Sequence, residues 1–120
     1  MPAKILINCN HGSEDAERAT LPFVIGNVAA TADQDTIVFL TIEGVRLATR
    51  GYADTIHKDG FPPLGEVIRS FVTNGGQIWA CSACTKPRGI VDADLIEGAK
   101  ITTAANFIEE VANGASVVSV

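Results

Sequence analysis

The sequence has 120 residues, of which 47% are hydrophobic and 19% are charged. This length allows one domain with a hydrophobic core and is too short for two, so a single domain over residues 1–120 is expected. A formal net charge of −5 without a basic run excludes nucleic acid and anionic membranes as expected partners. The small share of charged residues fits either subunit interfaces or a well-packed single α/β domain.

The cysteines and the N-terminal segment indicate the compartment. Three cysteines are an odd number, and no segment has the layout of a signal peptide. No apolar stretch approaches the length of a transmembrane helix. A structural disulfide framework is therefore not expected, and the sequence predicts a cytoplasmic protein with reduced thiols.

The first third of the chain has the pattern of a strand, a helix and a second strand. Lys4–Cys9 is a continuous apolar run, typical of a strand buried on both faces of a parallel sheet. Ser13 is a candidate N-cap for a helix reaching about residue 31. Pro22 lies inside this helix and is expected to kink or break it. Residues 35–41 are rich in β-branched and apolar side chains and predict the second strand.

The middle of the chain contains the clearest helical pattern. A turn at residues 43–45 precedes a short helix over 45–49, and residues 51–60 have the character of a loop in which His57 is solvated. Apolar side chains then recur at helical spacing over residues 64–72, between two prolines and an Asn-Gly-Gly stop. This segment is predicted to be an amphipathic helix.

The last third continues the alternation. Residues 78–81 and Ala99–Thr102 predict strands, separated by one or two helical turns at 92–97 with Asp92 as the cap. A helix over 103–113 and a final apolar strand over 115–120 follow. Strands thus alternate with helices along the whole chain, which favours a parallel sheet covered by helices on both faces.

In such a sheet the loops that follow the strands lie together at one edge, where the carboxyl ends of the strands meet. We call this the carboxyl edge. It is expected to carry the segments 9–11, 41–44, 81–89 and 102–103. Candidate functional residues are therefore sought in these segments.

The strongest candidate is the pair Cys81 and Cys84 in the sequence Cys-Ser-Ala-Cys. Such a pair can act as a redox dithiol, as half of a metal site, or as a nucleophile with a resolving partner. Lys86, Arg88 and free backbone N–H groups nearby are expected to lower the thiol pKa. The alternative is that either thiol is an inert core residue. The position of the pair beside two cations favours chemistry.

Two other segments of the carboxyl edge supply further candidates. Cys9 and His11 could complete a zinc site with the cysteine pair, but their one-residue gap is unusual for zinc and favours a core thiol at Cys9. His11 is a candidate base or proton shuttle near a thiol, or else a turn residue that forms a hydrogen bond. Glu43 is a supporting candidate at the same edge, or else a solvated carboxylate.

The turn at residues 10–13 precedes a predicted helix, and a helix N-terminus is a generic site for anions. It contains no glycine-rich dinucleotide or P-loop pattern, and Glu14 and Asp15 would repel a phosphate. No cofactor is therefore predicted.

The segment from Cys81 to Ile90, Cys-x-x-Cys-x-x-x-Arg-Gly-Ile, resembles the cysteine-to-Arg-Gly loop of the DsrE/DsrF-like family of sulfur-relay and sulfurtransferase subunits. Two other parts agree in chain order. These are the Gly-Ser-Glu-Asp-x-Glu-Arg-Ala segment at residues 12–19 and the Glu-Gly-Val turn at 43–45. The resemblance extends over most of the chain.

This resemblance implies a three-layer α/β/α sandwich with a five-stranded, mainly parallel sheet, which assembles as a homotrimer or homohexamer. It also implies a cytoplasmic role in which sulfane sulfur passes between a protein donor and a protein acceptor. The reactive cysteine of the family stands eight positions before the glycine of Arg-Gly, which is Cys81 in this sequence.

A second thiol at Cys84 departs from the single-cysteine pattern of the resemblance. It could resolve a persulfide on Cys81, giving a disulfide and releasing sulfide. Two alternatives to a sulfur carrier therefore stay open. One is a Cys81/Cys84 thiol–disulfide redox protein, and the other is a non-catalytic oligomeric or zinc-binding module.

Overall fold

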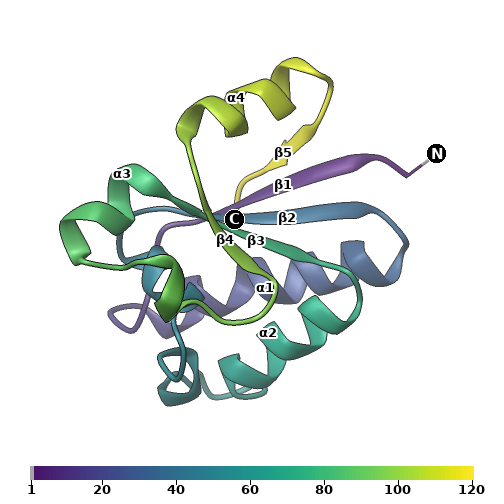
Figure 1. The fold of residues 1–120 in the computed structure, drawn as a ribbon. Helices are drawn as coiled ribbons and strands as arrows, with labels where there is room; N and C mark the ends of the chain where they lie inside the picture. Colours follow the sequence, from purple (N-terminus) through teal and green to yellow (C-terminus); the bar gives the residue numbers. More distant parts are fainter. Residues whose placement is uncertain (1) are drawn as a thin grey trace.

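The computed structural model describes residues 2–120, which form an α/β fold around one five-stranded sheet. Every strand pair is parallel, and the strand order is β4-β3-β2-β1-β5 (Figure 1). The five-stranded sheet expected from the sequence is thus confirmed. The strands are β1 (Lys4–Cys9), β2 (Asp35–Leu40), β3 (Gln77–Cys81), β4 (Ala99–Thr102) and β5 (Ser116–Val118).

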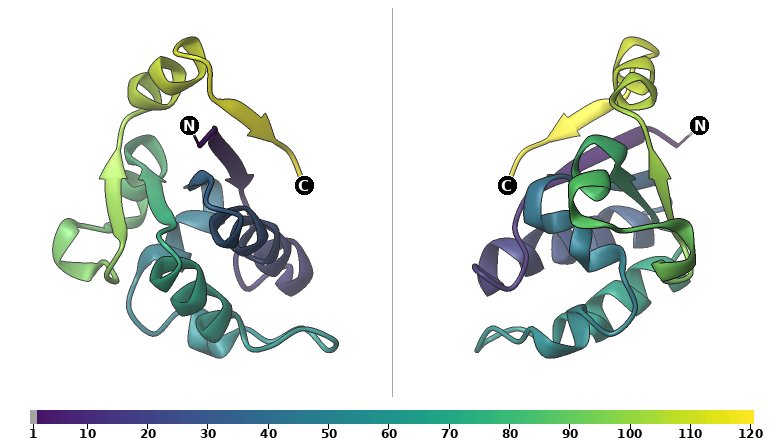
Figure 2. Two further views of the ribbon diagram at one scale, coloured as in Figure 1. Left: turned by 90° about the vertical axis from the view of Figure 1, so that its right-hand side faces the viewer. Right: turned by 60° about the vertical axis from the view of Figure 1, so that its left-hand side comes forward.

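The helices form two layers on opposite faces of the sheet (Figures 1 and 2). Helices α1 (Ala16–Thr31) and α2 (Leu64–Thr73) cover one face, and α4 (Ala104–Ala112) lies over the other. Short helical segments occupy the connections: η1 (Ile42–Ala48), η2 (Ala53–Thr55), α3 (Ser82–Thr85), η3 (Lys86–Arg88) and η4 (Asp92–Asp94). In the described part of the chain, no helix has both the length and the apolar character needed to cross a membrane.

Alternate residues of the three inner strands enter two separate hydrophobic clusters. On the α1/α2 side, Phe23 and Phe71 meet edge to face with ring centroids 5.8 Å apart. On the α4 side, Phe39 packs against Phe107 of α4 with centroids 4.4 Å apart. Because strand side chains alternate between faces, β1, β2 and β3 each contribute to both clusters. The position of a strand residue therefore decides which layer it contacts.

The first helix differs from the expectations in its N-cap and in its continuity. The N-cap is Asp15 rather than Ser13, and its carboxylate accepts a hydrogen bond from the backbone N–H of Arg18 at 3.1 Å. Pro22 does not break the helix, which continues to Thr31. A proline removes only the hydrogen bond to the carbonyl four residues earlier. Burial of this turn against the sheet, through Phe23 in particular, offsets that loss.

The connections also differ from the sequence-based expectation. The short helix expected over 45–49 begins earlier, as the 3₁₀ segment η1. The turns expected over 92–97 shorten to η4, whose cap is Val91 rather than Asp92. Residue 95 instead forms an isolated antiparallel bridge with Thr49. Long-range pairing of this kind leaves no periodic pattern in the sequence.

Candidate thiol site

The candidate site begins where β3 ends at the carboxyl edge. Cys81 is the last residue of β3 and the N-cap of α3, and Cys84 lies in the same short helix. The segments α3 and η3 turn away from the sheet (green in Figure 1). The turns after β1 and β2 lie at this edge as well, because all of these strands run in parallel.

The two thiols differ in burial. Cys81 is only 6% exposed and belongs to the cluster on the α4 side of the sheet. Cys84 is half-buried and packs against that same cluster and also against the cluster on the α1/α2 side. Both cysteines are free. Because Cys81 belongs to the cluster on the α4 side and Cys84 contacts it, the fold brings the two thiols to one region.

Glu43 and Arg88 form a contact between two turns of the carboxyl edge. Arg88 Nε donates to Glu43 Oε1 at 2.8 Å, and Arg46 Nε donates to Glu43 Oε2 at 3.0 Å. The hydrogen bond from Arg88, assisted by Arg46, lowers the pKa of Glu43 below its ordinary value. Glu43 is therefore held as a carboxylate that orients two guanidinium groups, which does not fit a general acid.

The contacts of Arg88 also define its part in the thiol loop. Its Nη1 donates to the backbone carbonyl of Cys84 at 3.1 Å. Arg88 thus links the turn after β2 to the turn that carries the thiols, and its charge is balanced by Glu43. This differs from the expectation that Arg88 acts directly on a thiolate. Lys86 is exposed on the same loop and remains a candidate source of positive charge.

Gly89 closes this loop through its backbone conformation. Its φ of 68° lies in the left-handed region that glycine adopts at little cost. This conformation lets the N–H of Ile90 donate to the carbonyl of Thr85 at 3.1 Å. Ile90 is buried, so it fixes the far end of the loop to the core. The Arg-Gly-Ile sequence therefore has a structural role beside the thiols.

Cys9 lies in the other hydrophobic cluster, on the α1/α2 side of the sheet. Its Sγ lies 3.8 Å from the carbonyl oxygen of His11 and 3.9 Å from that of Ala19. Burial raises the pKa of Cys9 to about 12, which keeps the thiol protonated at neutral pH. Cys9 is a core thiol, as its spacing from His11 predicted.

The zinc alternative does not agree with this arrangement. Cys9 and Cys81 face opposite sides of the sheet, because they enter different clusters. Between residues 2 and 120, no three or more His, Cys, Asp or Glu side chains are grouped so that they could hold a metal ion. The four ligands considered from the sequence are therefore not brought together.

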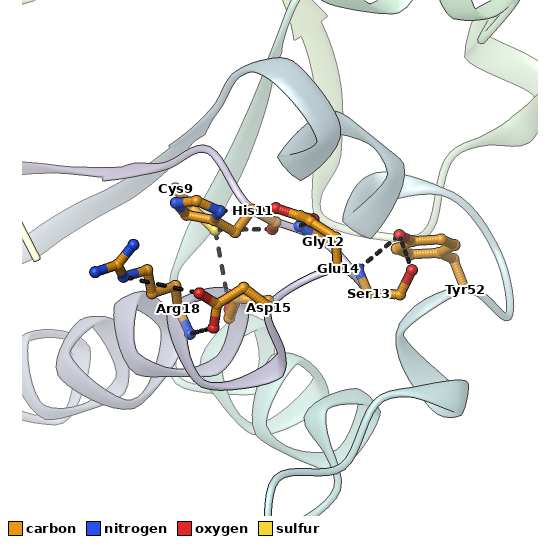
Figure 3. Close-up of polar contacts among 9 residues, drawn as sticks. Cys9, His11, Gly12, Ser13, Glu14, Asp15, Arg18 and Tyr52 are labelled. Atoms are coloured by element: carbon orange, nitrogen blue, oxygen red, sulfur yellow. Dashed lines mark hydrogen bonds and ion pairs between the residues drawn. The ribbon is translucent and has the colours of Figure 1, made fainter.

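His11 contacts a carboxylate rather than a thiol (Figure 3). Its Nδ1 lies 2.7 Å from Glu14 Oε2, while the N–H of Gly12 donates to Glu14 Oε1 at 2.6 Å. Partial burial alone would raise the pKa of Glu14, but the hydrogen bonds from Gly12 and His11 lower it. The contact between His11 and Glu14 was not predicted from the sequence. Their spacing of three residues, at the start of a predicted helix, could have indicated it.

Tyr52 fixes the same turn from a distant part of the chain. Its hydroxyl accepts a hydrogen bond from the N–H of Ser13 at 2.8 Å and donates to Ser13 Oγ at 3.0 Å (Figure 3). A Cβ on Gly12 would lie 2.5 Å from the Tyr52 oxygen, so the absence of a side chain at Gly12 lets the hydroxyl approach this turn. The loop after η1 therefore supports the β1–α1 turn.

The buried thiol of Cys9 predicts a pH dependence of stability. The pKa in the unfolded chain is about 8.5, whereas the folded state holds the proton up to about 12. The contribution is complete below the unfolded pKa and is lost as the pH rises from there toward the folded pKa. We therefore expect the free energy of unfolding to fall by about 2 kcal/mol between about pH 8 and about pH 10 because of Cys9.

Urea unfolding of the wild type and of Cys9→Ala at both pH values measures this effect. The variant lacks the titrating thiol, so its free energy of unfolding is expected to fall less over the interval. Equal decreases in the two proteins would contradict the assignment.

These features define a class of protein. It is a parallel α/β domain with a cysteine at the carboxyl edge of a central strand, followed by a short helical loop anchored by an Arg-Gly sequence. The DsrE/DsrF-like family matches residues 3–120, and the chain belongs to this family. The resemblance found in the sequence is thereby confirmed.

Archaeal relatives share parts of the sequence. The chain is 32% identical to the uncharacterized protein MJ0760 of Methanocaldococcus jannaschii over 97 residues, which are 81% of this chain and 35% of that protein. It is 26% identical to the uncharacterized protein MK0008 of Methanopyrus kandleri over 85% of this chain and 81% of that protein. The match thus spans about a third of the first relative's length.

Two solved structures share the fold. The ychN protein from E. coli has a TM-score of 0.80 at 21% identity, with 98% of this chain and 99% of that chain covered. MTH1491 from Methanobacterium thermoautotrophicum, a protein of unknown function, has a TM-score of 0.72 at 16% identity, with 98% and 99% covered. The likeness extends over the whole α/β domain.

Proposed function

We propose that this protein is a sulfur carrier or sulfurtransferase-like subunit that accepts sulfane sulfur as a persulfide on Cys81 and passes it to a partner thiol. The observation that carries the proposal is the position of Cys81. It ends a central strand at the carboxyl edge, eight positions before the glycine of the Arg-Gly sequence, in a chain of the DsrE/DsrF-like family. Sulfur relay is the role that the sequence resemblance implies.

The proposed transfer has two balanced steps. The Cys81 thiolate attacks the terminal sulfur of a donor persulfide, a new S–S bond forms on Cys81, and the donor leaves as a thiolate. An acceptor thiolate then attacks the terminal sulfur on Cys81, which leaves as a thiolate in turn. Neither step needs an external oxidant or reductant, so the chain can act without a cofactor.

The burial of Cys81 sets a condition on this transfer. With 6% of the residue exposed, Cys81 must become more accessible before a donor reaches its sulfur, and we propose that a movement of α3, which begins directly after Cys81, exposes it. This segment is only four residues long, and Ala83, Lys86 and Gly89 of the same loop are exposed. Short segments with few buried contacts are those that open most easily. The loop over residues 82–89 is therefore the proposed docking region for donor and acceptor.

The test is sulfur uptake by each cysteine variant after exposure to polysulfide or a persulfidated donor protein, followed by mass spectrometry. Wild type and Cys9→Ala are expected to gain sulfur on Cys81, and Cys81→Ser is expected to lose this uptake completely. Cys9→Ala is the matched control because Cys9 is a buried, protonated thiol. Uptake by Cys81→Ser equal to that of the wild type would refute the proposal.

A second candidate function is a Cys81/Cys84 redox dithiol. It is favoured by the three-residue spacing on one turn and by the packing of both residues against the same cluster. In this reaction the Cys84 thiolate attacks Cys81 Sγ, hydrosulfide leaves, and a disulfide forms. If this function is correct, Cys84→Ser is expected to retain the persulfide and to release no sulfide. If the protein is a sulfur carrier, wild type and Cys84→Ser are expected to release sulfide equally.

We also propose that the chain assembles as a homotrimer or homohexamer in the cytoplasm. Support comes from large apolar side chains that are exposed on α4 and beyond β5, such as Ile108 at 61% and Val120. Sedimentation of the purified protein at the mass of one chain would contradict the assembly. If the role were assembly alone, Cys81→Ser would leave the biological activity of the protein intact.

A further inference from the structure

Two polar side chains next to Cys81 are buried without a hydrogen-bond partner among the described residues. They are Trp79, 8% exposed, and Thr102, 5% exposed, whose Nε1 and Oγ1 atoms are unpartnered. Buried polar groups almost always have partners, since leaving one unpaired costs free energy. Both groups can donate a hydrogen bond, so each lacks an acceptor.

Both side chains lie on the same face of the sheet as Cys81. Trp79 stands two positions before Cys81 on β3, and strand residues two apart share a face. Thr102 is the direct partner of Cys81 in the parallel pairing of β3 with β4. Adjacent strands are about 4.8 Å apart, so Thr102 is an immediate neighbour of the thiol.

A positive charge lies on this face as well. Lys100 pairs with Trp79 across β3 and β4, and its Nζ is 4.9 Å from the centroid of the indole ring. Cys81 lies in an apolar cluster, and the polar groups that β3 and β4 add on this face are a hydroxyl, an indole N–H and an ammonium group. All three favour an anion or a hydrogen-bond acceptor.

We propose that Thr102 Oγ1 and Trp79 Nε1 donate hydrogen bonds to the terminal sulfur of a persulfide anion on Cys81, with Lys100 adding positive charge. This inference rests on the proposed function, since it requires sulfur on Cys81. A persulfide places its terminal sulfur about 2 Å beyond Sγ, and a side chain on the paired strand, about 4.8 Å away, is then within reach. The donors stay unpaired in the unloaded protein and gain their acceptor on loading.

The test measures the pH dependence of alkylation of the Cys81 persulfide by mass spectrometry after loading with polysulfide. Thr102→Val is expected to move the midpoint upward by about one pH unit, because it removes a hydrogen bond to the charged form. Trp79→Phe is expected to move it in the same direction. Thr102→Ser retains the hydroxyl and is expected to restore the midpoint of the wild type.

Thr36→Val is the matched control. Thr36 is a buried threonine on the opposite face, and its Oγ1 donates to the carbonyl of Gln34 at 3.0 Å. Thr36→Val is expected to lower the stability against urea. It is expected to leave the pH midpoint of persulfide alkylation unchanged. Thr102→Val is expected to leave the stability of the unloaded protein unchanged or to raise it, because its hydroxyl has no partner to lose.

Each outcome separates the inference from the proposed function. Sulfur uptake on Cys81 with the same midpoint in wild type, Thr102→Val and Trp79→Phe would overturn the inference and leave the carrier function in place. Absence of sulfur from Cys81 in the wild type would overturn both. A loss of stability in Thr102→Val as large as in Thr36→Val would show that the hydroxyl has another partner and would overturn the inference.

Discussion

Gly44→Ala is expected to destabilise the protein by roughly 2–3 kcal/mol, the upper part of the range found when a close-packed site is forced to accept extra atoms. A Cβ on Gly44 would overlap the carbonyl oxygen of Cys9 and lie 3.0 Å from its carbonyl carbon. That carbonyl cannot move freely, because it accepts a hydrogen bond from the N–H of Thr41 at 3.0 Å. The substitution must therefore separate η1 from the end of β1.

The same separation would reach the candidate site. Gly44 follows Glu43, whose carboxylate holds Arg88 and through it the carbonyl of Cys84. We therefore expect Gly44→Ala to slow sulfur uptake by Cys81 as well as to lower the urea midpoint of unfolding.

Gly12→Ala provides the matched control at the same edge of the sheet. Its Cβ would overlap only the Tyr52 hydroxyl, the end of a side chain that can rotate away, and would lie 3.0 Å from the backbone oxygen of Glu43, which needs to move far less than the Cys9 carbonyl in Gly44→Ala. Its cost is expected to be smaller, about 1 kcal/mol, from the lost hydrogen bonds to Ser13. A free energy of unfolding for Gly44→Ala at or above that of Gly12→Ala would show that the contact at Cys9 is not tight.

Phe71→Ala is expected to cost about 3–5 kcal/mol of the free energy of unfolding, the range for removing a fully buried aromatic ring. Phe71 is completely buried between the two helices and the sheet, with its ring edge-on to Phe23. A Cβ on Gly26 would lie 3.1 Å from the ring, so the glycine backbone packs directly against it. The tightly packed neighbours cannot easily move into the cavity that Phe71→Ala would leave, so the full cost is expected.

Thermal and urea unfolding measure this loss against Phe61→Ala. Phe61 is half-buried, and its truncation is expected to cost less than about 1 kcal/mol. Phe71 packs on the α1/α2 side, opposite the face of Cys81, so the fraction of Phe71→Ala that remains folded is expected to take up sulfur normally. Equal losses in the two variants would mean that α1 and α2 do not pack as described.

The turn after β2 combines strain with a link between segments. Ile42 has a φ of 55° and is exposed, although a β-branched residue rarely adopts this conformation. The next residue, Glu43, binds Arg88 of the thiol loop. Strained backbone persists where surrounding contacts hold it and is found at functional sites. This turn therefore supports the assignment of the carboxyl edge as the functional edge.

The sequence by itself determined the main strands and helices and the position of Cys81 at the end of a strand. The apolar run at Lys4–Cys9 and the helical stripe that became Leu64–Thr73 follow from local periodicity, which side-chain burial imposes on each segment alone. The alternation of these segments determined a parallel sheet, and hence the carboxyl edge at which Cys81 lies.

The tertiary structure decided the faces and the long-range contacts. A strand that is apolar throughout carries no sign of which side meets which helix, so only packing placed Cys9 and Cys81 on opposite faces. Glu43 and Arg88 are 45 positions apart, and their contact depends on the strand order. The unpartnered donors beside Cys81 likewise follow from the pairing of β3 with β4, because hydrogen-bond satisfaction is a property of the assembled neighbourhood.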